Sequence, residues 1–302
     1  MLVHEMGLRM AIGIATRGRA DILRQTLLEI RSQTLQPDRV IVCHTDPADV
    51  AGLGDVAGLG DMAAVEFITA ASSLPRQRNA ILDRADDCDV LLFLDDDFLM
   101  APGYVQTTAA AFMTWPDIVV TTGWTIADGA RGPGFTPEAA RTLIREAAHQ
   151  ATPTEPWPVD HGYGCNMAIR LAPARAHDVR FDERLPLYGW SEDVDYTHRL
   201  GRHGRLVKLP GARGVHLGTK HGRTSGVRLG YSQVANPIYL LNKGSYGWRR
   251  AFGSVGRNLV ANAVKSLWPE PYIDRRGRLG GNALAFLDLV RGRLDPERVL
   301  KI

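Results

Sequence analysis

Short, wholly apolar segments alternate with helical patterns over the first hundred residues, and this alternation limits the possible folds more than any other feature. We predict strands at residues 10–15, 39–44, 65–68 and 89–94. Between them, apolar residues recur at helical spacing in residues 21–31, and a further helix covers 78–84. Strands that are apolar on both faces must be covered on both faces. The pattern therefore predicts an α/β fold with a mixed, mostly parallel sheet flanked by helices.

The pattern loosens after residue 97. We expect helices at 103–115, 136–150 and 191–203, and strands at 118–122, 163–170 and 205–209. One direct repeat interrupts the first half, because AGLGDV at 51–56 is followed at once by AGLGDM at 57–62. Two copies of six residues are too short for a solenoid, so the repeat predicts a duplicated loop.

Charge is distributed unevenly along the 302 residues, although the net charge is only +3. Residues 236–302 contain 12 Lys and Arg against five Asp and Glu, whereas residues 1–235 contain 24 against 28. The balanced total argues against a general nucleic-acid binder. The asymmetry predicts two parts with different partners, a body at 1–235 and a basic helical extension at 236–302.

The cysteines and the hydropathy pattern bear on the compartment. Cys43, Cys88 and Cys165 lie far apart in or beside apolar segments, which favours buried thiols in a reducing compartment over a disulfide or a metal site. No apolar segment approaches the roughly 18 residues that span a bilayer. The first ten residues lack the apolar core of a secretory signal. We therefore expect a cytoplasmic protein, either free or attached to the inner face of the membrane.

Three adjacent carboxylates, Asp95, Asp96 and Asp97, follow the apolar segment 90–94. Like charges at such spacing repel one another unless a cation neutralises them. Mg²⁺ and Mn²⁺ prefer oxygen ligands and commonly bind through one or two carboxylates plus substrate phosphates. At the carboxyl end of a central strand, the triplet predicts a cation site, and a solvated acidic turn is the alternative.

A second acidic cluster, Glu192, Asp193 and Asp195, follows two aromatic residues, Tyr188 and Trp190. A carboxylate that aromatic side chains partly desolvate has a raised pKa and can act as a general base. The alternative is that these acids cap the first turn of a helix.

Basic residues and histidines add candidate anion and metal contacts. Thr16, Arg17 and Arg19 follow the first strand, and Arg76 and Arg78 open a helix. Such turns can contact a phosphate, and an ordinary surface helix is the alternative. His216 and His221 lie in the glycine-rich segment GVHLGTKHG, where we expect His216 to be the better metal ligand.

In this order the motifs resemble the inverting glycosyltransferases of family 2, which have the Rossmann-like GT-A fold. The resemblance covers about residues 10–220 and rests on three elements that occur together: LPRQRNA at 74–80, LFLDDD at 92–97 and GWSEDVDYTHRL at 189–200. It implies a transferase of the hexosyltransferase type that uses Mn²⁺ or Mg²⁺. A nucleotide-binding half would cover about 10–100 and an acceptor half about 101–235.

The resemblance also implies roles for individual residues. Thr16, Arg17 and Asp46 would hold the nucleobase and ribose, and Arg78 would approach the nucleotide. Asp95 and Asp96 are similar to the ribose-side and metal-side members of the family's Asp-x-Asp motif, and Asp97 and His216 to its metal ligands. The remaining roles lie on the acceptor side: Asp193 as catalytic base, Glu192 beside it, and Trp190 and Asn166 as sugar contacts. The turn His44-Thr45-Asp46-Pro47 departs from the Asp-Gly-Ser turn of many relatives.

The implied substrates are a nucleoside-diphosphate sugar, with uracil as the expected base, and a hydroxyl of a glycan or lipid-linked acceptor. The basic segment 236–302 is either a lid on the catalytic domain or a peripheral contact with an anionic membrane. Two other functions stay open. A nucleotidyltransferase would need a glycine-rich basic loop directly after the first strand, which this chain lacks. A non-catalytic sugar-binding module would have no need of Asp95, Asp97 and Asp193 together.

Overall fold

The computed structural model describes residues 2–54, 65–221 and 224–302. The chain forms two compact units, each built from separate segments. The first unit comprises Met1–Ser72, Arg76–Arg180 and Thr197–Gly222, and the second comprises Ser73–Pro75, Phe181–Tyr196 and Arg223–Ile302. The second unit thus combines the C-terminal part of the chain with two segments from its middle.

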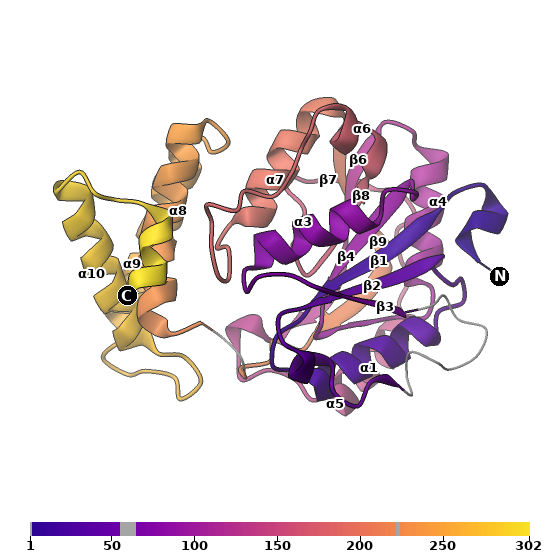
Figure 1. Ribbon diagram of the computed structural model, residues 1–302. Helices are drawn as coiled ribbons and strands as arrows, with labels where there is room; N and C mark the ends of the chain where they lie inside the picture. Colours follow the sequence, from indigo (N-terminus) through magenta and orange to yellow (C-terminus); the bar gives the residue numbers. More distant parts are fainter. Residues whose placement is uncertain (1, 55–64, 222–223) are drawn as a thin grey trace. The chain divides into compact units, whose positions relative to one another are not determined.

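A nine-stranded sheet forms the centre of the first unit, with the order β3-β2-β1-β4-β8-β6-β9-β5 and β7 paired to β9 (Figure 1). Its first four strands run parallel to one another. They are β1 (Met10–Ala15), β2 (Arg39–His44), β3 (Val65–Thr69) and β4 (Val90–Asp95). These are the continuous apolar segments of the sequence, and β1, β2 and β4 are almost completely buried.

The other half of the sheet mixes directions. β8 (Asn166–Arg170) runs antiparallel to both β4 and β6 (Ile118–Asp128). β9 (Arg205–His216) runs parallel to β6 and antiparallel to β5 (Phe98–Met100) and β7 (Trp157–Pro158). This register places Asp128 beside His216 across β6 and β9, and Phe98 beside His216 across β5 and β9.

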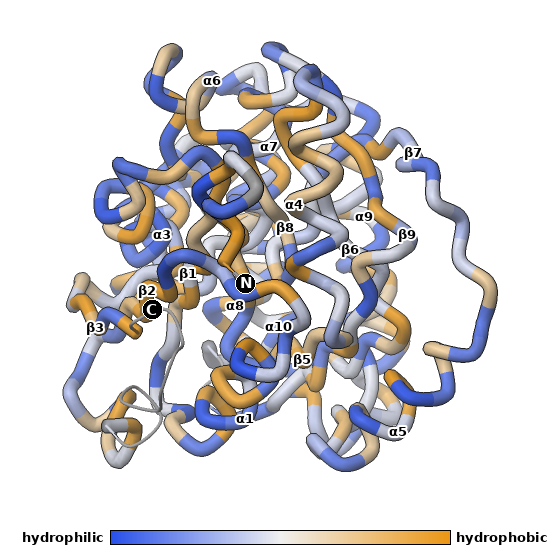
Figure 2. The backbone as a smooth tube through the Cα atoms, turned by 90° about the vertical axis from the view of Figure 1, so that its right-hand side faces the viewer, coloured by the Kyte–Doolittle hydropathy of each residue, from blue (hydrophilic) through white to orange (hydrophobic). Residues whose placement is uncertain are grey.

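Helices cover both faces of the parallel strands. Apolar residues of α1 and α4 pack with Met10, Ile12 and Ile14 of β1 in one core. On the opposite face Gly13 lies directly against Ile81 of α3. The colouring in Figure 2 alternates between hydrophilic and hydrophobic along α1, as expected for a helix with one buried face. Among the described residues, the α-helices with residues in this unit are α1 (Ala20–Arg31), α3 (Leu74–Arg84), α4 (Tyr104–Thr114), α5 (Pro137–Ala148), α6 (Leu171–Ala176) and α7 (Glu192–Leu200).

The second unit is helical. It contains α8 (Gly226–Lys243), α9 (Trp248–Lys265), α10 (Arg275–Val290) and the 3₁₀ helix η5 (Pro296–Lys301). A Cβ at Gly230 would overlap the backbone of Arg278, and one at Gly281 would overlap the backbone of Val227, so these glycines let α8 and α10 approach closely. Within the three described ranges, no helix is long and apolar enough to cross a bilayer.

The predicted α/β class, the mixed sheet and the C-terminal helical extension are confirmed. The strands predicted at 118–122 and 205–209 instead extend to Asp128 and His216. The apolar pattern in the sequence ends near glycines. The backbone pairing of β6 with β9 continues past these positions through register shifts. All three cysteines are buried thiols, as expected. Most of the predicted repeat loop falls at residues 55–64, outside the described residues.

Gly218 lies where the loops that follow β6 and β9 approach each other closely, and a substitution there tests this contact. It has a φ of 67°, and a Cβ there would overlap the backbone of Gly129. We expect Gly218→Ala to lower the free energy of unfolding by about 2 kcal/mol or more, since the backbone conformation and the contact are both unfavourable. Urea unfolding would measure this. Gly132→Ala is the control, because a Cβ at Gly132 meets nothing within 4 Å. Equal effects of the two changes would contradict the packing described here.

Candidate active site

Three strand ends bring acidic residues and a histidine together in the first unit. Asp95 ends β4, Asp128 ends β6 and His216 ends β9. The short pairing of β5 with β9 adds Asp97, whose carbonyl accepts a hydrogen bond of 2.9 Å from the amide of Leu217. The cluster thus depends on long-range strand pairing, since its members come from three separate parts of the chain.

Asp95, Asp97 and His216 have the composition and spacing of a cation site. His216 Nε2 lies 3.3 Å from Asp97 Oδ1 and 3.7 Å from Asp95 Oδ2. One ligand atom from each residue lies within 4.8 Å of the other two. The other ring nitrogen of His216 lies 2.9 Å from Asp128 Oδ1, and this contact orients the ring. Two carboxylates and an imidazole suit Mn²⁺, and an outer carboxylate on the histidine is a common feature of such sites.

The protonation of this cluster reflects concentrated negative charge. Burial by itself would lower the pKa of His216, but its contacts with Asp128 and Asp97 raise it to about 10. Burial would raise the pKa of Asp97, yet His216, Arg19 and the amide of Thr219 hold it well below its usual range. In the protein alone, a protonated imidazole therefore supplies positive charge to the carboxylates.

Asp96, the middle member of the triplet, makes contacts of a different kind. Its carboxylate accepts a hydrogen bond of 2.7 Å from the Thr16 hydroxyl and forms an ion pair of 2.6 Å with Arg19. Burial raises the pKa of Asp96 to about 7, against the opposing charge of Arg19. Its carbonyl also accepts a hydrogen bond of 2.7 Å from Thr26 of α1. Asp96 therefore ties the triplet to the first strand and to α1, while Asp95 and Asp97 contact His216.

The turns after β1 and β2 are joined by a residue that the sequence analysis did not select. The carboxylate of Asp49 accepts hydrogen bonds from the amides of Gly18 at 2.6 Å and of Thr45 and Asp46 at 2.9 Å. Of the three residues predicted to hold the nucleobase and ribose, Arg17 and Asp46 are exposed and Thr16 is buried. The side chain of Asp46 caps the 3₁₀ helix η2 (Pro47–Val50).

Arg78 and Asn166 lie beside the end of β4, where the acidic triplet begins. The buried guanidinium of Arg78 donates a hydrogen bond of 2.7 Å to the carbonyl of Gly164 and lies 3.4 Å from Asp95. Asn166 pairs with Leu94 across β8 and β4, and its side chain bonds to the hydroxyls of Thr122 and Thr125. Arg78 is therefore placed to balance the charge of Asp95. Asn166, which is 1% exposed, is held within the sheet.

The second acidic cluster belongs to the second unit. Glu192 is buried, and Asp193 is partly exposed at the first turn of α7. Helix α8 holds this segment in two places. Asn236 donates a hydrogen bond of 3.0 Å to the carbonyl of Trp190, and the ammonium of Lys243 lies 2.9 Å from Asp195 and 2.6 Å from Asp182. The C-terminal part of the chain thus supports the segment that contains the predicted catalytic base.

Sequence patterns did not point to Asp49 or Asp128, and they indicated Arg19 only as a candidate anion contact. Arg19 follows Arg17 by two residues, but nothing local indicates that Arg19 is the one paired with Asp96. Asp128 would have been a candidate if the strand predicted at 118–122 had been extended to the end of β6. Asp49 lies three residues after Asp46, where its capping role is a recognisable local pattern.

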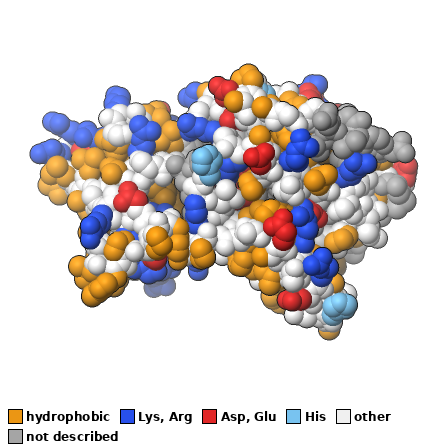
Figure 3. Space-filling view, turned by 90° about the horizontal axis from the view of Figure 1, so that it is seen from below, with side chains coloured by type: hydrophobic (Ala, Val, Ile, Leu, Met, Phe, Trp, Pro, Cys, Tyr) orange, Lys and Arg blue, Asp and Glu red, His pale blue; other side chains and the backbone are white. Residues whose placement is uncertain are grey.

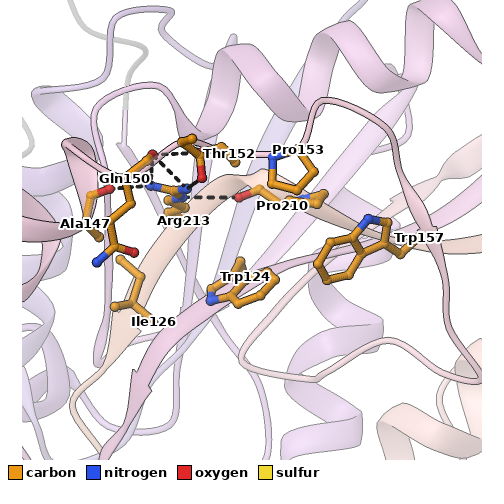
Figure 4. A pocket seen from close by; sticks show the side chains of 10 residues that line it. Trp124, Ile126, Ala147, Gln150, Thr152, Pro153, Trp157, Pro210 and Arg213 are labelled. Carbon is orange, nitrogen blue, oxygen red and sulfur yellow. Dashed lines mark hydrogen bonds between the residues drawn. The ribbon is translucent and has the colours of Figure 1, made fainter.

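A separate hollow lies between the end of α5 and strands β6, β7 and β9 (Figure 4). Trp124 and Trp157 line it, with their rings 5.3 Å apart at 71°. Arg213 closes one side by donating hydrogen bonds to carbonyls that include those of Gln150 and Pro210. None of its lining residues belongs to the predicted site.

The pair formed by Arg19 and Asp96 supplies a prediction about the site's framework. In Arg19→Met the buried Asp96 loses its cation, so we expect the free energy of unfolding to fall by about 3 kcal/mol. Arg17→Met is the control, because Arg17 is exposed and a surface change of this kind usually costs less than about 0.5 kcal/mol. Urea unfolding at neutral pH compares the two. A loss of less than about 1 kcal/mol in Arg19→Met would show that this pair does not support the triplet.

Solved structures with similar folds are glycosyltransferases. The mannosyltransferase PcManGT from Pyrobaculum calidifontis, solved with GDP-Man and Mn²⁺, has a TM-score of 0.55 and 13% identity, covering 97% of this chain and 85% of its own. S. aureus TarS 1–349 with UDP-GlcNAc has a TM-score of 0.58 and 14% identity, covering 96% and 90%. GalNAc-T7 with UDP, GalNAc and Mn²⁺ has a TM-score of 0.57 and 17% identity, covering 95% and 59%. In another TarS structure, with a TM-score of 0.52 and 17% identity, the match covers 78% of this chain and only 40% of the other.

At these identities the solved structures establish the fold alone. No curated protein matches the sequence. The family comes from a sequence model described as "Glycosyl transferase family 2", which matches residues 11–177. That range holds the four parallel strands except for Met10, together with the acidic triplet and Asp128, and it is more than half of the chain. The fold, the triplet and the family model agree, and the chain belongs to glycosyl transferase family 2.

Proposed function

We propose that the protein is a metal-dependent inverting glycosyltransferase. It transfers a sugar from a nucleoside diphosphate, with uridine diphosphate as the expected carrier, to a hydroxyl of a glycan or lipid-linked acceptor. The observation that carries the proposal is the cluster of Asp95, Asp97 and His216 where three strand ends meet. Structures of similar fold were solved with GDP-Man and Mn²⁺, and with UDP, GalNAc and Mn²⁺, which supports the same class of donor here.

On the donor side, Asp97 and His216 would hold Mn²⁺ or Mg²⁺, with Asp95 beside them. A bound cation at this place supplies Lewis-acid stabilisation of the diphosphate leaving group. The nucleoside would lie over the turns after β1 and β2, where the exposed side chains of Arg17 and Asp46 are available. Thr16, Asp96 and Arg78 then act mainly by fixing the triplet, since each is buried and bonded to its neighbours.

On the acceptor side, Asp193 is the proposed general base, with Glu192 and Trp190 helping to place the acceptor. The carboxylate of Asp193 takes the proton of the acceptor hydroxyl as the acceptor oxygen bonds to the anomeric carbon. The bond from that carbon to the diphosphate breaks at the same time, and the electron pair leaves with the diphosphate. One displacement from the opposite side inverts the anomeric configuration. Asn166 is buried and hydrogen-bonded, so its proposed contact with sugar would require a change of partners.

The predicted boundary between residues 1–235 and 236–302 stays a prediction, as do the cytoplasmic location and the contact of the extension with the inner face of a membrane.

Donor binding tests the proposal first. We expect UDP, GDP or dTDP to bind the wild-type protein in isothermal titration calorimetry when Mn²⁺ or Mg²⁺ is present, and to bind at least tenfold more weakly without a metal. Asp97→Asn should remove the metal-dependent part, because it takes a charged ligand from the cluster. Asp86→Asn, a change of an exposed carboxylate, should leave it intact. If no nucleoside diphosphate binds in the presence of either metal, the proposal is wrong.

Asp193→Asn separates chemistry from binding. A positioned general base contributes roughly 100- to 10,000-fold to a rate, so we expect sugar transfer to fall by about 100-fold or more. Binding of the nucleoside diphosphate with metal should stay within about twofold of wild type. Calorimetry and a transfer or donor-hydrolysis assay measure the two effects. Transfer at the wild-type rate in Asp193→Asn would remove Asp193 from the role of base while leaving the donor site in place.

A further inference from the structure

Helix α9 presents a ridge of apolar side chains to solvent. The ridge follows every fourth residue from Trp248 to Val264, with Gly256 at one position, and continues just past the helix end. Its side chains are between 57% and 80% exposed: Trp248, Phe252, Val260, Val264, Leu267 and Trp268. Side chains four residues apart are neighbours on a helix surface, so within the helix these side chains form one continuous ridge, which winds by about 40° at each step. Soluble monomers rarely leave an apolar strip of this length uncovered.

A basic ridge runs beside the apolar one. Arg249, Arg257 and Lys265 are exposed and spaced eight residues apart. Each directly follows, in the sequence, a position of the apolar ridge. The sequence of α9, WRRAFGSVGRNLVANAVK, contains no acidic residue. The nearby Glu270 pairs with Lys265 and Arg275, which leaves Arg249 and Arg257 as the main source of positive charge on this face. Figure 3 shows hydrophobic and basic side chains close together on the part of the surface formed by the C-terminal helices.

The opposite face of α9 is already occupied. Ala251 and Val255 are buried, and the amide of Asn262 donates hydrogen bonds of 2.9 Å to Gln233 and 3.0 Å to Asn282. These contacts fix the orientation of the helix in its unit. The apolar ridge is therefore a fixed outer surface, and exposed residues on it can be changed without removing contacts of the core.

We propose that α9 binds in the plane of an anionic lipid surface. Its apolar ridge would enter the boundary between headgroups and acyl chains, and its basic ridge would meet the negative headgroups. Trp248 and Trp268 stand at the two ends of the ridge, and tryptophan prefers the interface between membrane and water. The inference rests on the helix itself and does not depend on the proposed sugar transfer.

Charge favours a lipid surface over a second copy of the chain. A symmetric contact between two α9 helices would place the same patch on both sides. The basic side chains of both copies would then gather around one contact with no acidic residue of α9 to offset them, and such an accumulation of like charge is unfavourable. Negative lipids complement both features of the helix.

Vesicle cosedimentation of the full chain tests this inference. We expect binding to vesicles of phosphatidylcholine with 30% phosphatidylglycerol, and at least tenfold weaker binding to phosphatidylcholine alone. The triple variant Phe252→Gln, Val260→Gln, Val264→Gln should lose most of the binding. Arg249→Gln with Arg257→Gln should weaken binding to the anionic vesicles by about tenfold at low salt. The control, Leu28→Gln with Arg31→Gln on α1, removes one exposed apolar and one exposed basic residue and should bind as wild type does.

Circular dichroism and thermal unfolding would establish that each variant is folded, and the arginine variant keeps the test valid if the triple variant is not. A shift of tryptophan emission to shorter wavelength on adding anionic vesicles, reduced in Trp268→Phe, would support insertion of the ridge. Three results would overturn the proposal: wild type that does not bind anionic vesicles, wild type that binds both vesicles equally, or folded variants that bind as wild type does. A dimer in gel filtration that the triple variant disrupts, without vesicle binding, would assign the face to a second copy instead.

Discussion

Concentrated negative charge at the meeting of three strand ends is the constraint on which the rest of this structure depends. Asp95, Asp96, Asp97 and Asp128 lie in a small volume, and the positive groups that contact them are His216, Arg19 and Arg78. In the absence of these partners, repulsion and burial would make the arrangement unfavourable. In the proposed function, the same concentration of charge would attract a divalent cation and, through it, a diphosphate. Framework and proposed chemistry therefore use the same carboxylates.

The three residues of the triplet make different contacts. Asp95 and Asp97 contact His216. Asp96 instead binds Thr16 and Arg19 through its carboxylate, and its carbonyl connects the strand end to α1. The second acidic segment is organised by its own unit, because Asn236 and Lys243 of α8 contact Trp190 and Asp195. The C-terminal helices are thus part of the support for the proposed catalytic base. The same three-helix arrangement leaves one face of α9 apolar and basic.

The parallel strands, the acidic triplet and the choice of His216 as a candidate metal ligand could be made from local signals: continuous apolar segments, adjacent carboxylates and a glycine-rich histidine segment. The missing information is of long range. Pairing of β5 with β9 brings Asp97 to His216, and register shifts carry β6 to Asp128, which no local pattern specifies. Sequence spacing likewise could not separate Asp96 from its neighbours, or show that Phe181–Tyr196 folds with the C-terminal helices. The family resemblance predicted the class of reaction, whereas the pairing of the strands determines which residues lie together.

A crystal of the protein grown with Mn²⁺ and UDP would test the central claim most directly, by anomalous diffraction at the manganese edge. The account predicts one anomalous peak at coordination distance from Asp97 and His216, with the diphosphate oxygens on the same ion and the nucleoside over the turns after β1 and β2. A manganese ion bound elsewhere, or a diphosphate bound with no metal near Asp97 and His216, would contradict it.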